Sequence, residues 1–125
     1  ESRRRQHDSF LLTTYTKASD IEQLRDERIS LIDSQVEILR GSIESNQQRL
    51  KDLELRLATF LPYSTAPGAR RVPDQLAGEV VRTMKERDQL RDALKSREKE
   101  KAELRAQFNE DIARYKELTT RPAGR

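Results

Sequence analysis

The sequence predicts an all-α protein, an antiparallel coiled-coil helical hairpin with a short N-terminal helix packed at its open end. The first observation is the composition: the chain has 125 residues, of which 38% are charged and 34% hydrophobic, with no Cys and no Trp. Such a chain can bury a narrow stripe between helices but has little material for a globular core. The second observation is that apolar residues form two long stripes with heptad spacing, and the third is that a segment rich in Pro separates them. The sustained heptads favour helices over a disordered chain.

Residues 1–18 are predicted to form a basic lead-in followed by a short apolar helix. The lead-in contains Arg3, Arg4 and Arg5, and the apolar cluster that follows consists of Phe10, Leu11, Leu12 and Tyr15. We expect this cluster to close the open end of the hairpin, with Tyr15 opposite Leu118. Whether it packs against its own chain or against a second copy stays open.

Residues 19–61 are predicted to form the first long helix. Apolar residues recur there with alternating spacings of three and four, which is typical of a coiled-coil seam. The stripe consists of Ile29, Ile32, Val36, Leu39, Ile43, Asn46, Leu50, Leu53, Leu57 and Phe60. Ser19 and Glu22 form a capping-box pattern at the start, and Pro62 predicts the end, because the residue before a proline avoids the helical region.

Residues 62–74, "PYSTAPGARRVPD", are predicted to form the loop at the tip of the hairpin, since three prolines and a glycine prevent regular structure. Residues 75–119 form the second long helix, whose seam contains more polar positions, and residues 120–125 form a tail. The loop is short, so the two helices should be antiparallel neighbours.

Asn46 and Arg87 are predicted to form a polar layer that sets the register. In this register the polar residue of the first stripe lies opposite a polar residue of the second, and Ile29 lies opposite Leu104. A slip of one heptad would place Asn46 against Leu94, which would leave the amide without a polar partner.

A second apolar stripe on the first long helix is formed by Leu24, Leu31 and Ile38, which are spaced by sevens. A two-stranded hairpin would leave these residues in water, so we expect them to bind another helix. Together with Phe10, Leu11, Leu12 and Tyr15 they make up the predicted partner or dimer interface, and the partner is a second copy or another helical protein. The alternative is that they are scattered surface residues.

No catalytic, cofactor-binding or metal-binding residue is predicted. The chain has no Cys and a single histidine, His7, which we expect to be exposed to solvent without a carboxylate partner. A zinc site or a nucleophile–base pair therefore cannot be built, and the glycines stand alone rather than in a phosphate-binding loop. There is no apolar run of the length that spans a membrane. We expect a protein that is not an enzyme.

Tyr63, Arg70 and Arg71 are predicted contact residues at the tip, where coiled-coil hairpins commonly bind partners. They and the N-terminal arginines support the alternative function, a nucleic-acid-binding helical arm. We do not favour it, because 25 basic residues are mixed with 22 acidic ones and form no stripe of one sign. A solvated loop without a partner is the other interpretation.

Two blocks at the ends of the chain resemble a known group of proteins. The opening "RRRQHDSFLLTTYTKASDIEQLRDERI" and the closing "AQFNEDIARYKEL" are similar to the C-terminal coiled-coil region of a group of proteobacterial exported envelope proteins of unknown function. The matching residues are Asp8, Leu11, Leu12, Thr14, Tyr15, Asp20, Ile21, Arg25 and Asp26 in the opening and Phe108, Asp111, Arg114, Tyr115 and Leu118 in the close; "RRVPDQL" resembles the typical start of the second helix.

The resemblance implies export, with a signal peptide and an N-terminal domain of unknown function preceding this chain, and it implies no catalytic residue. The loop "LPYSTAPGA" is longer than in that group, so no function of the tip carries over. We expect a mature form or fragment of a periplasmic or envelope-associated protein, with the cytoplasm as the alternative. The predicted function is that of a non-enzymatic scaffold or protein-partner-binding module that acts through helix–helix association.

Overall fold

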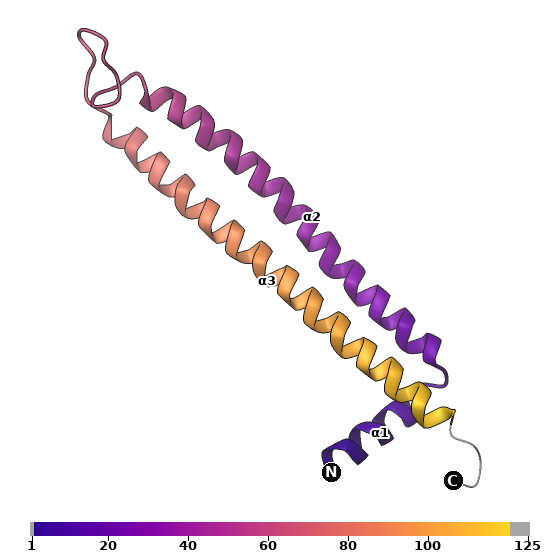
Figure 1. Ribbon diagram of the computed structural model, residues 1–125. Coiled ribbons are helices and arrows are strands. Elements are labelled where there is room, and N and C mark those ends of the chain that lie inside the picture. The colour runs from indigo at the N-terminus through magenta and orange to yellow at the C-terminus, as the bar shows by residue number, and fades with distance from the viewer. Residues whose placement is uncertain (1, 121–125) are drawn as a thin grey trace. The chain divides into compact units, whose positions relative to one another are not determined.

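The computed structural model describes residues 2–120 and has three helices in the order α1 (Ser2–Thr14), α2 (Ala18–Leu57) and α3 (Asp74–Thr119) (Figure 1). The long helices α2 and α3 pack antiparallel as a hairpin, and the short α1 contacts α3. The predicted fold class is therefore confirmed.

The chain divides into two compact units. The end unit comprises residues 2–34 and 97–120, and so contains α1 with the first part of α2 and the last part of α3. The loop unit comprises residues 35–96 and contains the remainder of both long helices with the loop that joins them.

The start of α2 is organised by Asp20. Its Oδ2 accepts hydrogen bonds from the backbone N–H of Thr16 (3.2 Å), from the Thr16 hydroxyl (2.7 Å) and from the backbone N–H of Lys17 (3.3 Å). These bonds, that of the Thr16 hydroxyl above all, lower the pKa of the Asp20 carboxyl. The helix begins at Ala18, one residue before the predicted start, because Asp20 supplies the capping acceptor that we had expected from Ser19 and Glu22.

The end of α2 was predicted at residue 61, but the regular helix ends at Leu57. The next turn tightens, since Thr59 N–H donates to Arg56 O (3.2 Å) and Phe60 N–H to Leu57 O (3.0 Å). The Thr59 hydroxyl also donates to Arg56 O at 2.7 Å. These bonds to residues three positions back satisfy the last carbonyls before Pro62 is reached. α3 begins at Asp74, one residue before the predicted start. Of the predicted tail, residues 121–125 lie outside the described residues.

Each unit has its own buried residues. In the end unit, Leu11, Ile21, Ile112 and Tyr115 form a cluster against which Tyr15, Ala18 and Phe108 pack, and Ile29 and Ile32 are buried as well. In the loop unit, the buried residues are Val36, Leu50, Leu53 and Leu76 with the polar Asn46 and Thr83. The buried α2 residues from Ile29 to Leu53 all belong to the predicted seam.

Candidate interaction surfaces

The docking of α1 onto α3 depends on one fully buried side chain. Leu11 has no exposed surface and lies in the cluster with Ile21, Ile112 and Tyr115. The Tyr115 hydroxyl donates to the backbone carbonyl of Tyr15 at 3.1 Å, just where α1 has ended. Leu11 and Tyr15 therefore lie in the end unit against α3 of the same chain; the prediction had placed Tyr15 opposite Leu118, whereas its hydrogen-bond partner is Tyr115.

Two contacts between polar side chains also hold α1 against α3. Arg114 donates to both carboxylate oxygens of Asp8, from Nε at 2.8 Å and from a terminal nitrogen at 2.7 Å. The Asp8 and Arg114 side chains are each only 19% exposed. This paired hydrogen bond holds the pKa of the Asp8 carboxyl below its usual range and raises the pKa of Arg114.

The second polar contact corrects our expectation for His7. We had expected this histidine to lack a carboxylate partner, but its Nε2 lies 2.8 Å from Asp111 Oδ1. The side chain of Asp111 is 14% exposed and that of His7 is 43% exposed. The contact was missed because the two residues are 104 positions apart in the chain, and only the docking of α1 brings them together.

Other parts of the α1 surface are exposed. Phe10 and Leu12 are 52% and 48% exposed. The ring of Phe10 lies 6.3 Å from that of His7 and 6.4 Å from that of Tyr15, measured between ring centres. Of the four residues of the predicted apolar cluster, Leu11 and Tyr15 thus contribute to docking, whereas Phe10 and Leu12 remain accessible. Arg3, Arg4 and Arg5 are exposed residues of the same helix.

The second stripe of α2 differs from residue to residue. In the end unit, Leu24 is half-buried, whereas Leu31 is 66% exposed. The helix α1 belongs to the same unit, yet it leaves the side chain of Leu31 uncovered. Leu31 lines a shallow surface depression of about 810 Å³ with residues of the same helix, among them Glu27 and Ser30. In the loop unit, Ile38 is 70% exposed. Leu31 and Ile38 are the most exposed large hydrophobic side chains of α2. At these two residues, the predicted interface is therefore accessible to a partner.

The polar layer of the loop unit has different partners from those predicted. Asn46 is 2% exposed, and its Nδ2 donates to the backbone carbonyl of Thr83 (3.0 Å) and to Glu86 Oε1 (3.1 Å). Arg87 instead forms an ion pair with Asp88 at 3.1 Å. These contacts are incompatible with the one-heptad slip against Leu94. Arg87 does not serve as the polar partner because it pairs with its neighbour Asp88, whereas the backbone carbonyl of the buried Thr83 and the carboxylate of Glu86 lie within hydrogen-bond reach of the Asn46 amide.

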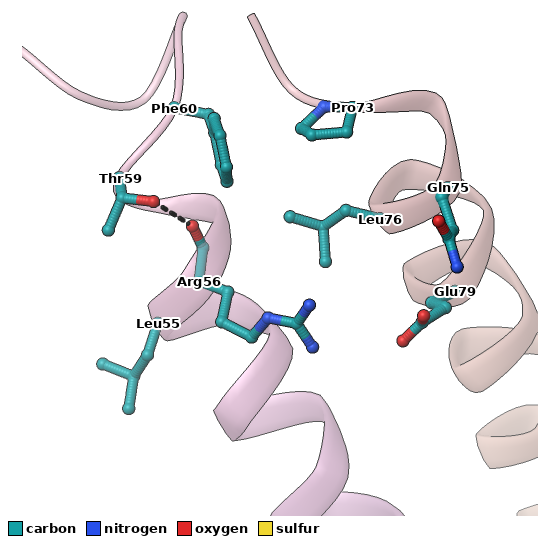
Figure 2. A pocket seen from close by; sticks show the side chains of 8 residues that line it. All are labelled: Leu55, Arg56, Thr59, Phe60, Pro73, Gln75, Leu76 and Glu79. Atoms are coloured by element: carbon teal, nitrogen blue, oxygen red, sulfur yellow. Dashed lines mark hydrogen bonds between the residues drawn. The ribbon is translucent and has the colours of Figure 1, made fainter. Parts of the chain in front are cut away.

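The tip of the loop unit has two neighbouring depressions. One, of about 540 Å³, lies between the end of α2 and the start of α3. Figure 2 shows Phe60 and Leu76 pointing toward one another across it, while Arg56 extends toward the α3 side and Leu55 points away. Leu55 is 65% exposed.

The second depression, of about 370 Å³, contains two of the three predicted tip residues, Tyr63 and Arg71. Tyr63 is 62% exposed, and Arg70 and Arg71 are also exposed. Its other lining residues come from the end of α2, the loop and the start of α3: Leu57, Leu61, Pro62, Val72, Ala77, Val80 and Val81. We call this depression the loop groove. The sequence signalled its basic residues but not its aliphatic floor, because Val81 lies off the seam and Val72 lies in the loop.

Among residues 2–120, no group of three or more His, Asp or Glu side chains is placed to hold a metal ion. Within the same residues, none of the helices combines the length and the apolar character needed to cross a membrane.

Comparisons of the chain with protein-family models, with curated proteins and with solved structures found no match.

Proposed function

We propose that this protein is a non-enzymatic coiled-coil module that binds a helical protein partner, and that a second copy of the chain is such a partner. The observation that carries the proposal is the exposure of Leu31, 66% on a helix whose seam is already buried against α3. Complete burial of one such side chain contributes about 1.5–3 kcal/mol, so a helix that covered this face would gain that free energy at Leu31.

The charges around Leu31 are compatible with association of two copies. Glu27 and Arg28 lie one turn before it on the same helix, at the spacings that bring side chains together, and their charges are opposite. Ser34, three residues after it, is uncharged. A copy facing this surface therefore meets no block of like charge, which would oppose pairing.

The bacterial envelope is the compartment that we propose, with the cytoplasm as the alternative. Support comes from the resemblance of the two end blocks to exported proteobacterial proteins. In the structure, Asp8, Leu11, Arg114 and Tyr115 from those two blocks contact one another or share one cluster. Fractionation of the native cells, followed by immunodetection, tests this part: recovery with the cytoplasmic fraction would contradict it.

Sedimentation velocity of the purified chain at micromolar concentration tests the association. We expect a concentration-dependent dimer, and we expect Leu31→Glu to shift it to monomer because the substitution places a charge in the contact. Gln48→Glu is the matched control, since residue 48 is an exposed position of the same helix and does not line the depression that contains Leu31. A monomer at all concentrations, or equal behaviour of both variants, would contradict self-association.

A further inference from the structure

Backbone hydrogen bonds fix the conformation of the loop that lines the loop groove. Leu61 N–H donates to Arg70 O at 2.7 Å, and Val72 N–H donates to Leu61 O at 3.3 Å, so the two sides of the loop are tied together. Tyr63 N–H donates to Phe60 O at 2.9 Å. Gly68, with a φ of 77°, reverses the chain between them, a conformation that favours glycine.

The floor of the groove is aliphatic. Leu57 comes from the end of α2, Leu61 and Val72 from the two tied segments, and Val80 and Val81 from α3. Leu61 is 42% exposed and Val81 is 51% exposed, so apolar surface remains accessible there. A volume of about 370 Å³ accommodates one or two large side chains, and it lies at the lower end of the range for ligand pockets.

The loop segment beside this apolar floor carries charge of one sign. Residues 55–73 include Arg56, Arg70 and Arg71 and no Asp or Glu. Arg71 lines the groove, and Arg70 precedes it. Exposed arginines favour carboxylates because the guanidinium can donate two parallel hydrogen bonds to them.

We infer that the loop groove binds an acidic peptide segment of a partner protein, with a large aliphatic or aromatic side chain on the floor and neighbouring carboxylates on Arg70 and Arg71. This names the chemistry of a partner at a surface that shares no residue with the exposed stripe of α2. The inference therefore stands or falls separately from self-association through Leu31.

The lining favours a peptide over a nucleic acid. Single-stranded nucleic acids are held by several aromatic rings on which bases stack, along a basic groove. The loop groove offers one aromatic ring, Tyr63, beside five Leu and Val side chains. An acidic peptide satisfies both the charge and the apolar floor.

Fluorescence anisotropy with the complete chain tests the inference. The probe is a fluorescein-labelled peptide in which aspartates and glutamates flank a leucine and a phenylalanine. We expect saturable binding that weakens with salt and falls about tenfold or more with either Arg71→Glu or Val81→Glu. Arg91→Glu, at an exposed position of α3 outside the groove, makes the same charge change as Arg71→Glu and should leave binding unchanged. Circular dichroism establishes that each variant remains helical.

Two further probes make the alternatives distinguishable. A peptide with the same acidic residues but alanines in place of leucine and phenylalanine should bind at least about tenfold more weakly, because it leaves the floor empty. Absence of binding, equal binding of the alanine peptide, or equal loss with Arg91→Glu would overturn the inference. Tighter binding of a single-stranded oligonucleotide that displaces the peptide would overturn it in favour of nucleic acid. Loss of self-association with Arg71→Glu would instead assign the groove to a second copy.

Discussion

Arg114 of α3 holds Asp8 of α1 by both carboxylate oxygens, at 2.8 and 2.7 Å. The buried cluster contains Leu11, one turn after Asp8 in α1, and Tyr115, the residue that follows Arg114 in α3. A bidentate contact fixes direction as well as distance, because both planar groups must align. The pair therefore sets the orientation in which α1 presents Leu11 to α3.

Exchange of these two charges tests that role. Asp8→Asn should lower the hydrogen-exchange protection of the α1 amides, since the neutral amide cannot accept two charge-assisted bonds from Arg114. The double variant Asp8→Arg with Arg114→Asp should recover part of that protection because it restores an ion pair with reversed polarity. Equal protection in the wild type and Asp8→Asn would show that the cluster alone positions α1.

Acid should release α1 through the same pair. Arg114 lowers the folded-state pKa of Asp8 from its ordinary value of 3.8, and Asp20, at the start of α2, is shifted in the same direction by the bond from Thr16. A lowered pKa means that the stabilisation is complete above about pH 5 and is lost as the pH falls through the folded-state pKa, below 3.8. We expect α1 protection to be constant from neutral pH to about pH 5 and to fall in more acidic solution, with a smaller acid-dependent loss in Asp8→Asn. A loss centred near neutral pH would contradict this assignment.

Leu11 should dominate the stability of the end unit among the α1 residues. Leu11→Ala should reduce the free energy of unfolding by about 2–5 kcal/mol, since it leaves a cavity beside Ile112 and Tyr115. Leu12→Ala is the matched control: Leu12 is 48% exposed, so its truncation should change that free energy by less than about 0.5 kcal/mol. Urea denaturation followed by circular dichroism measures both, and equal effects would contradict the buried position of Leu11.

Asn46 should tolerate no negative charge. Asn46→Asp places a carboxylate in a position that is 2% exposed and within reach of Glu86, and it removes the amide that donates to Thr83 O. We expect a loss of about 3–5 kcal/mol, as for an unpaired buried charge. Gln47→Glu, next to it on the exposed side, should have little effect. Thermal denaturation compares the two, and similar midpoints would show that Asn46 is not buried against α3.

Much of the fold could be predicted because a heptad stripe of apolar residues indicates both that a segment is helical and which face of the helix is buried. Ile29, Ile32, Val36, Asn46, Leu50 and Leu53 were predicted in the seam and are buried. The predictions that failed concern hydrogen bonds, at the end of a helix and around the buried Asn46. The regular part of α2 ends before Pro62, in a turn where the Thr59 hydroxyl donates to Arg56 O. Asn46 donates to Thr83 O and Glu86, whereas Arg87 had been predicted as its polar neighbour.

The contacts of α1 could be predicted only in part. The cluster signalled that apolar residues close the hairpin, but the seam pattern does not say which of four adjacent side chains faces α3. The spacing of Asp8, Leu11 and Tyr15 by three and four residues places them on one face of a helix, as does that of Asp111, Arg114 and Tyr115. Matching these two faces would have found the Asp8–Arg114 pair, whereas the loop groove depends on a chain reversal that no periodic pattern describes.

Disulfide cross-linking tests the central proposal, binding of a second helical chain at the exposed stripe of α2, most directly. The chain has no cysteine, so a single introduced cysteine reports only on its own position. Under mild oxidation at micromolar concentration, Leu31→Cys should form covalent dimers much faster than Gln48→Cys, an exposed position of the same helix outside the depression that contains Leu31. Equal, slow cross-linking of the two variants would contradict association of two copies through this face.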